Sequence, residues 1–325
     1  MAVTEHQRDD TSSDGESIQD EGEEVEANVG LSYTIKQVKQ DTTARIGLYI
    51  IGFMTAVTVF TTVDAVVFDY GFAKTFLHDP VSDPNNINEL RLLPPVGMGG
   101  ELQYPLGTDE RGRDILTRLI YGTRIAMTAG FFATAVGFVG GTIIGAVSGY
   151  YGGWVDDVLQ RITETMYAIP FLVLVIAIMA VLGNNIWFAI VGVGVASIPV
   201  FNRLIRSRVV SVREEEYIEA AKAAGVKDRN IILRHVIPNS FAPVLVQSTL
   251  QIGYAILIIA GLSFLGFGAQ PPTPSWGQML AGSRHHMINA PTFSIWPGLA
   301  ILVTVIGFNL FGDGLQDALD PRIDN

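Results

Sequence analysis

Five stretches of this chain, each at least 18 residues long, contain no charged side chain. A helix needs about 20 apolar residues to cross the roughly 30 Å of hydrocarbon in a membrane. The third stretch divides at the polar turn Gly183-Asn184-Asn185, and the last two are trimmed at loop residues. One such run could be a core helix of a soluble protein, but six predict an all-α polytopic membrane protein. The six helices are expected at roughly 44–66, 124–149, 164–183, 186–206, 242–266 and 292–312.

Charge is distributed unevenly along the chain. Charged residues make up 16% of the sequence and apolar residues 49%, whereas soluble domains contain about 25% charged residues. Ten acidic residues and one arginine lie in residues 1–29, a composition that favours disorder and does not fit a signal peptide. We therefore expect three parts: an acidic, disordered cytoplasmic tail at 1–40, a first helix with an outer loop and an interfacial helix at 41–123, and a five-helix core at 124–325 with a cytoplasmic loop at 203–242.

Lysine and arginine residues predict the orientation, because they collect on the cytoplasmic side of membrane proteins. With the N-terminus inside, 13 of those near the membrane fall on the inner side of the six predicted helices and six on the outer side. We therefore expect a multi-pass protein of the cell (plasma) membrane, in contact with lipid, with both termini in the cytoplasm. The rest of the chain after the acidic residues 1–29 is nearly neutral and has no basic surface that would favour binding to nucleic acid.

The centres of the predicted helices hold no ionisable side chain, which argues against a proton-coupled transporter. Gln247, Gln251 and Asn309 are polar, and they either join helices or line a substrate path. The chain has no cysteine and no phosphate-binding loop of the form G-x-x-x-x-G-K-[ST]. We therefore expect no catalytic residues, no metal site and no cofactor.

Glycines recur at four-residue spacing in the second predicted helix, at Gly137, Gly141, Gly145 and Gly149. This spacing puts all four on one stripe, where another helix can approach closely. Proline removes a backbone donor and bends a helix, so kinks are expected where proline falls within or near a helix, at Pro170, Pro199 and Pro297.

The cytoplasmic loop contains a run of alanine, glutamate and lysine from Arg213 to Ala224, which predicts a helix. Gly225 is expected to end that helix in the left-handed conformation. Asp228 is expected to cap a second short helix at about 229–236, and Pro238 to stop it.

The residues Glu219-Ala220-Ala221, followed by Gly225 and Pro238, resemble the EAA loop of ABC-type importer permeases. This resemblance implies that the loop is a coupling helix that docks on an ATP-hydrolysing subunit. His235 stands where the family pattern has an aliphatic residue. The segment from Arg234 to Asn239 nevertheless resembles the variant found in dipeptide/oligopeptide/nickel permeases.

A segment before the second predicted helix resembles the signature of the C-type permeases of that family, with Thr117 in place of a serine. We expect Thr108 or Asp109 to cap an amphipathic helix on the outer membrane surface, with Arg111, Asp114 and Arg118 on its polar face. The end of the chain also resembles the family, except for Gln316 in place of an arginine. The signature residues are Gly107, Thr108, Asp109, Gly112, Arg113 and Asp114.

The resemblance spans roughly residues 40–325 and implies the transmembrane domain of a type I ABC importer, with a permease role and no enzymatic activity of its own. It favours an importer for di- or oligopeptides, while members of the family also handle nickel and, in some cases, sugars. It also implies four kinds of contact: a second homologous permease, two ABC ATPase subunits, an extracytoplasmic substrate-binding protein and lipid. A stand-alone secondary transporter or channel is the main alternative, and a membrane scaffold is another.

Overall fold

The computed structural model describes residues 37–319, which form helices and loops without a β-strand. Most of the acidic segment predicted at 1–40 lies outside the described residues. Five of the helices are long and apolar enough to cross a membrane: α2 (Thr42–Val67), α5 (Ile115–Tyr151), α8 (Ile186–Val212), α12 (Ala242–Phe264) and α14 (Thr292–Leu319).

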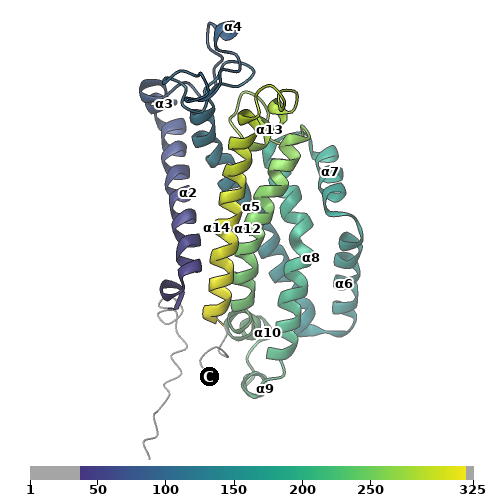
Figure 1. The fold of residues 1–325 in the computed structure, drawn as a ribbon. Helices are drawn as coiled ribbons and strands as arrows, with labels where there is room; N and C mark the ends of the chain where they lie inside the picture. The colour runs from purple at the N-terminus through teal and green to yellow at the C-terminus, as the bar shows by residue number, and fades with distance from the viewer. Residues whose placement is uncertain (1–36, 320–325) are drawn as a thin grey trace, which may run out of the picture.

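The five long helices lie roughly side by side in one bundle (Figure 1). Three short helices lie at one end of the bundle: α3 (Gly71–Phe76), α4 (Ile87–Leu90) and α13 (Trp276–Ser283). At the other end are α9 (Glu216–Ala223), α10 (Asp228–Ile231), a π-helical turn η1 (Ile232–Val236) and α11 (Ile237–Asn239). We call the first end the cap and the second the loop end. α2 begins and α14 ends at the loop end.

The third predicted helix is broken in the structure. The chain forms α6 (Gly153–Ala168) and α7 (Phe171–Leu182), which meet at an angle of 97°. Pro170 follows Ile169, whose extended backbone conformation (ψ 131°) is typical of a residue before proline. The prediction of one helix at 164–183 is therefore wrong in detail: the bent pair counts as a sixth span only if both halves are taken together.

The second predicted helix is longer than expected. α5 runs without a break over 37 residues, or about 55 Å at 1.5 Å per residue. It therefore includes the segment before residue 124 that the sequence predicted as a separate interfacial helix. No proline interrupts residues 115–151, and Gly122 packs against Trp276 of α13, so this segment continues the bundle and does not turn onto the membrane surface.

α5 and α8 pack closely along the glycine stripe. A Cβ atom added at Gly137 would lie 2.8 Å from the Cβ of Ser197, and one at Gly145 would lie 2.7 Å from the carbonyl oxygen of Asn202. Such distances leave no room for a side chain. By contrast, only 11% of the most apolar 18-residue stretch of α2 is buried. Most of the apolar surface of α2 is therefore left for lipid.

Candidate functional site

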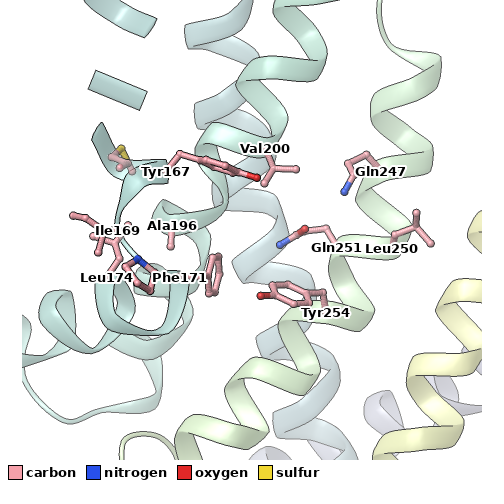
Figure 2. A pocket seen from close by; sticks show the side chains of 12 residues that line it. Tyr167, Ile169, Phe171, Leu174, Ala196, Val200, Gln247, Leu250, Gln251 and Tyr254 are labelled. Atoms are coloured by element: carbon pink, nitrogen blue, oxygen red, sulfur yellow. The ribbon is translucent and has the colours of Figure 1, made fainter. Parts of the chain in front are cut away.

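A cavity of about 500 Å³ lies between the α6–α7 bend, α8 and α12 (Figure 2). Most of its lining is apolar or aromatic, and the polar groups are two amides, Gln247 and Gln251, and two phenols, Tyr167 and Tyr254. No charged side chain lines this central cavity. Apolar walls with a few polar groups are typical of ligand sites in proteins.

The two glutamines differ in their bonding. The Nε2 of Gln251 donates to the Oγ of Ser197 on α8 at 2.9 Å, so this buried amide joins two helices. Gln247 lies one turn away on α12, and its side chain makes no hydrogen bond with the part of the chain that the structure describes. Its amide is therefore free to bind a molecule in the cavity.

Only part of this site could be predicted from the sequence. Gln247 and Gln251 both line the cavity, whereas Asn309 lies exposed on α14 and does not. Tyr167 could not be predicted because its position depends on the bend at Pro170 and on how α6 packs against α8. The proline itself was the one sequence signal that pointed to this bend. Tyr254 lies on α12 three residues after Gln251, so the helical spacing could have placed it on the same face.

A polar seam holds α6 against α8 beside the central cavity. The carboxylate of Asp156 accepts two hydrogen bonds from Arg206, at 2.7 and 2.5 Å. One turn further, Asn202 donates to Gln160 and Thr163 at 3.0 and 3.1 Å. These residues recur every three to four positions on α6 and so share one face of that helix. The seam attaches α6 to the bundle by polar contacts.

The outward face of α6 is also charged. Asp157, Arg161 and Glu164 are exposed, and an Arg161 nitrogen lies 3.7 Å from the Glu164 carboxylate. Charged groups on a membrane helix usually face a polar cavity or a protein partner, because exposure to hydrocarbon is costly. This face of α6 is therefore unsuited to direct contact with lipid tails.

At the loop end, α9 presents the EAA residues on its surface. Glu219 and Ala220 are exposed and Ala221 is half-buried. Ile218, between them and the bundle, is fully buried in a core cluster with Ile205 and Val209 of α8. This contact ties the exposed helix to α8.

Two further contacts tie the loop to the end of α5. Arg213 donates to the carbonyl oxygen of Gly149 at 2.9 Å, and the Tyr150 hydroxyl donates to Asp228 at 2.9 Å. Gly225 has φ +78° and separates α9 from α10, as predicted. Movement of this loop would therefore be transmitted to both α5 and α8.

Two details of the predicted loop are wrong. Asp228 is the first residue of α10 and caps nothing with its side chain, which instead binds Tyr150. Pro238 does not stop a helix, because α10, η1 and α11 follow one another to Asn239. A proline is tolerated in the first turn of a helix, where its missing N–H has no partner to lose, and Pro238 stands in the first turn of α11.

In the cap, the signature residues fold into a compact loop. The carboxylate of Asp109 accepts hydrogen bonds from the backbone N–H groups of Arg111 and Arg113 and from the Arg113 side chain, at 2.8 to 3.0 Å. The hydroxyl of Thr108 accepts from the backbone N–H of Leu93 at 2.8 Å. Gly107 and Gly112 have φ +83° and +75°, a conformation that glycine adopts without strain.

The helix cap predicted at Thr108 or Asp109 is supplied by Asp114, whose carboxylate accepts from the N–H groups of Leu116 and Thr117. Asp114 and Arg118, expected on a polar outer face, are buried, with 2% and 1% of their surface exposed. The sequence missed this because the partners of Arg118, such as the carbonyl oxygen of Pro80 at 2.6 Å, are distant in the chain.

Asp79 and Tyr104 in the cap have shifted pKa values. Burial alone would raise the pKa of Asp79, but hydrogen bonds from the N–H groups of Ser82 and Val81 outweigh it and lower the pKa below its ordinary value. Asp79 therefore stabilises this turn above the ordinary aspartate pKa, and that contribution is lost as the pH falls through the lowered value. Burial raises the pKa of Tyr104, and the charges of Asp114 and Glu101 add to this effect.

Replacing Asp114 with alanine is expected to destabilise the cap by about 1–2 kcal/mol, because loss of an N-cap side chain costs about 0.5–2 kcal/mol and Thr117 also loses a partner. The melting temperature of the purified chain in detergent measures this. The control is Lys74→Ala, which removes an exposed ion pair with Asp69, worth about 0–1 kcal/mol, at a helical position that alanine tolerates. Equal melting temperatures for both variants would contradict the assignment.

The known proteins that this chain resembles are components of transport systems. Residues 141–325 match the family model described as "Binding-protein-dependent transport system inner membrane component". The chain is 42% identical over 288 residues to the dipeptide transport system permease protein DppC of Alkalihalophilus pseudofirmus, covering 89% of this chain and 88% of that protein. It is 45% identical over 218 residues to the glutathione transport system permease protein GsiD of Pectobacterium atrosepticum, covering 67% and 72%.

Among solved structures, an inward-facing conformation of the MetNI methionine ABC transporter matches with a TM-score of 0.50 at 20% identity, covering 63% of this chain and 98% of that chain. At this identity, the likeness concerns the fold alone. It agrees with the predicted type I importer architecture.

Proposed function

Since this chain belongs to the inner-membrane components of binding-protein-dependent transport systems, we propose that it forms, with a second homologous permease, a path by which small peptides cross the membrane. Membership makes it a multi-pass permease subunit of an ABC importer and implies an ATPase and a substrate-binding protein as partners. The proposal goes beyond membership in four respects: the peptide cargo, the second permease, the two copies of the ATPase and the orientation.

The observation that carries the proposal is the central cavity. Its free Gln247 amide and its two tyrosine hydroxyls are neutral donors and acceptors that can exchange hydrogen bonds with peptide groups. Relatives of this chain are named for dipeptide and glutathione transport. A weakly binding, uncharged lining suits passage, because a cargo must leave the path as well as enter it.

The second permease is supported by the charged face of α6. Asp157, Arg161 and Glu164 need a polar environment, and a shared water-filled path between two permeases supplies one. In this arrangement the α6–α7 bend, α8 and α12 form one wall, and the partner forms the other.

The loop end is proposed to face the cytoplasm, with both termini, and to receive the ATPase. Glu219, Ala220, Ala221 and Gly225 then form the docking surface around α9, with Pro238 in the following helical segment. Movement of the ATPase would reach the membrane helices through Ile218, Arg213 and the Tyr150–Asp228 hydrogen bond. The cap then faces outward and receives the binding protein.

Purification of the chain from its native membrane in mild detergent, with mass spectrometry of the proteins that accompany it, tests the assembly. Recovery of a second permease and of P-loop ATPases is the expected result. Recovery of the chain alone in several mild detergents would contradict the proposed complex.

Gln247→Leu is expected to lower dipeptide uptake about fivefold, because the loss of one hydrogen bond costs about 1 kcal/mol and Gln247 has no structural hydrogen bond to lose. Uptake of radiolabelled dipeptide by proteoliposomes containing the full transporter measures this, at matched protein levels. Asn309→Leu is the control, since it removes a similar amide that does not line the cavity. Unchanged uptake in Gln247→Leu would exclude this cavity from the path.

A further inference from the structure

A second cavity, of about 330 Å³, lies in the cap between α13, the loop after α12 and the first turns of α5. Four arginines and two carboxylates contribute to its walls. We call it the arginine cavity. Its charged residues are Arg111, Arg113, Arg118, Arg284, Asp109 and Glu110.

The two carboxylates are already engaged. Asp109 accepts three hydrogen bonds from its own loop, one of them from the Nε of Arg113 at 2.8 Å. Glu110 lies 3.6 Å from the Nε2 of His286. Arg284 makes no ion pair with any described residue. Arg118 forms an ion pair with the Asp109 carboxylate at 3.7 Å but no hydrogen bond with it. Arg111 and Arg113 lie 3.5 and 3.7 Å from Asp83, which does not line the cavity. The arginine cavity therefore has an excess of positive charge.

Two residues that line this cavity each hold a buried polar atom without a hydrogen-bond partner among the described residues. One such atom is the Nε of Arg118, whose residue is only 1% exposed, and the other is the Oε1 of Gln278 on α13. A buried polar group without a partner costs about 1–3 kcal/mol, and more if it is charged. Arg118 also donates through its Nη1 atom to the carbonyl oxygens of Pro80 and Pro272, so only its Nε lacks a hydrogen-bond partner. A cationic donor and a neutral acceptor that both lack such a partner, on residues of one cavity, match a ligand that carries an anionic acceptor and an N–H donor.

We propose that the arginine cavity binds the C-terminal end of a peptide. The terminal carboxylate is bound by Arg118 and Arg284, because guanidinium and carboxylate groups form strong, charge-assisted hydrogen bonds. The adjacent amide N–H is bound by the Oε1 of Gln278. The inference rests on the proposed function, and it adds a peptide-binding site at the cap end, away from the central cavity. Because the cap is proposed to face outward, this site would meet peptides before they enter the path.

The test uses the full transporter in nanodiscs without its binding protein, and saturation-transfer NMR with three probes: dialanine, dialanine amide and acetate. Dialanine is expected to bind saturably. The amide lacks the carboxylate and acetate lacks the peptide N–H, so each is expected to bind at least tenfold more weakly. Gln278→Met and Arg284→Gln are each expected to weaken dialanine binding at least tenfold. Arg91→Gln, which removes an exposed cap arginine outside the cavity, is expected to have no effect.

Stability separates a binding role from a structural one. Gln278→Met removes an unpaired acceptor, so the melting temperature should stay the same or rise, whereas a purely structural glutamine would lower it. Absence of saturable dialanine binding, equal binding of the amide or of acetate, or unchanged binding in both variants would each overturn the assignment.

Dialanine uptake by proteoliposomes with the binding protein tests the proposed function separately. If dialanine is taken up but Gln278→Met and Arg284→Gln bind it unchanged, the peptide site in the arginine cavity is wrong and the proposed function stands. Saturable binding without uptake overturns peptide transport alone.

Discussion

Gly225→Val is expected to lower peptide uptake about tenfold while ATP hydrolysis continues. Gly225 has φ +78°, and a Cβ atom there would meet nothing within 4 Å, so the effect arises from the backbone alone. The left-handed conformation costs a residue with a side chain about 1–2 kcal/mol, and β-branched residues are the most strained. Relief of this strain would break the turn in which the N–H of Gly225 donates to Lys222 and that of Val226 to Ala221, and so reorient α9.

ATPase activity and uptake are measured together in proteoliposomes that contain the assembled transporter. Gly225→Asn is the matched control, because asparagine tolerates the left-handed conformation far better than valine, and it should retain most of the uptake. Normal uptake and normal subunit association in Gly225→Val would show that this turn does not couple the ATPase to the membrane helices.

Gly141→Ala is expected to destabilise the bundle by about 1–3 kcal/mol, the usual cost of inserting a methyl group into a packed interior. Its Cβ would lie 2.8 Å from both the backbone nitrogen of Asn202 and the carbonyl oxygen of Ile198. These are backbone atoms of α8, so they cannot move aside as a flexible side chain can. The two helices must separate along the whole glycine stripe.

The measurement is the melting temperature in detergent, together with the monodisperse fraction after purification. Gly261→Ala in α12 is the control, because a Cβ there meets nothing within 4 Å, and alanine stabilises a helix relative to glycine by about 0.5–1 kcal/mol. A melting temperature for Gly141→Ala equal to that of Gly261→Ala would mean that the α5–α8 contact is looser than described.

The membrane helices could be predicted because their cause is local. A run of about 20 uncharged residues such as 292–312 must form a helix in hydrocarbon, whichever neighbours it meets. The predicted helices at 44–66, 186–206 and 242–266 likewise correspond to α2, α8 and α12. The turn at Gly225 could also be predicted locally, because a glycine directly after a helical run favours the left-handed conformation that ends a helix.

The contacts between helices could not be predicted in this way. The glycine stripe indicated a close neighbour, but only the fold identifies α8 as that neighbour. Arg118 looked like a surface residue, because its partner at Pro80 is 38 residues away. Likewise, Gln160 and Asn202 form part of a seam only once α6 lies against α8.

The sequence by itself determined which segments are long and apolar enough to span a membrane and which loop carries the EAA residues, since each depends on neighbouring residues in the chain. It did not determine which proline breaks a helix, because Pro199 and Pro297 lie inside continuous helices and only Pro170 stands at a break. Only the tertiary structure decided that two glutamines share a cavity with two tyrosines, and that Arg118 and Gln278, each with a polar atom that lacks a hydrogen-bond partner, line one cavity in the cap. Both outcomes require helices distant in sequence to pack at one orientation, and that orientation comes from the sum of many side-chain contacts.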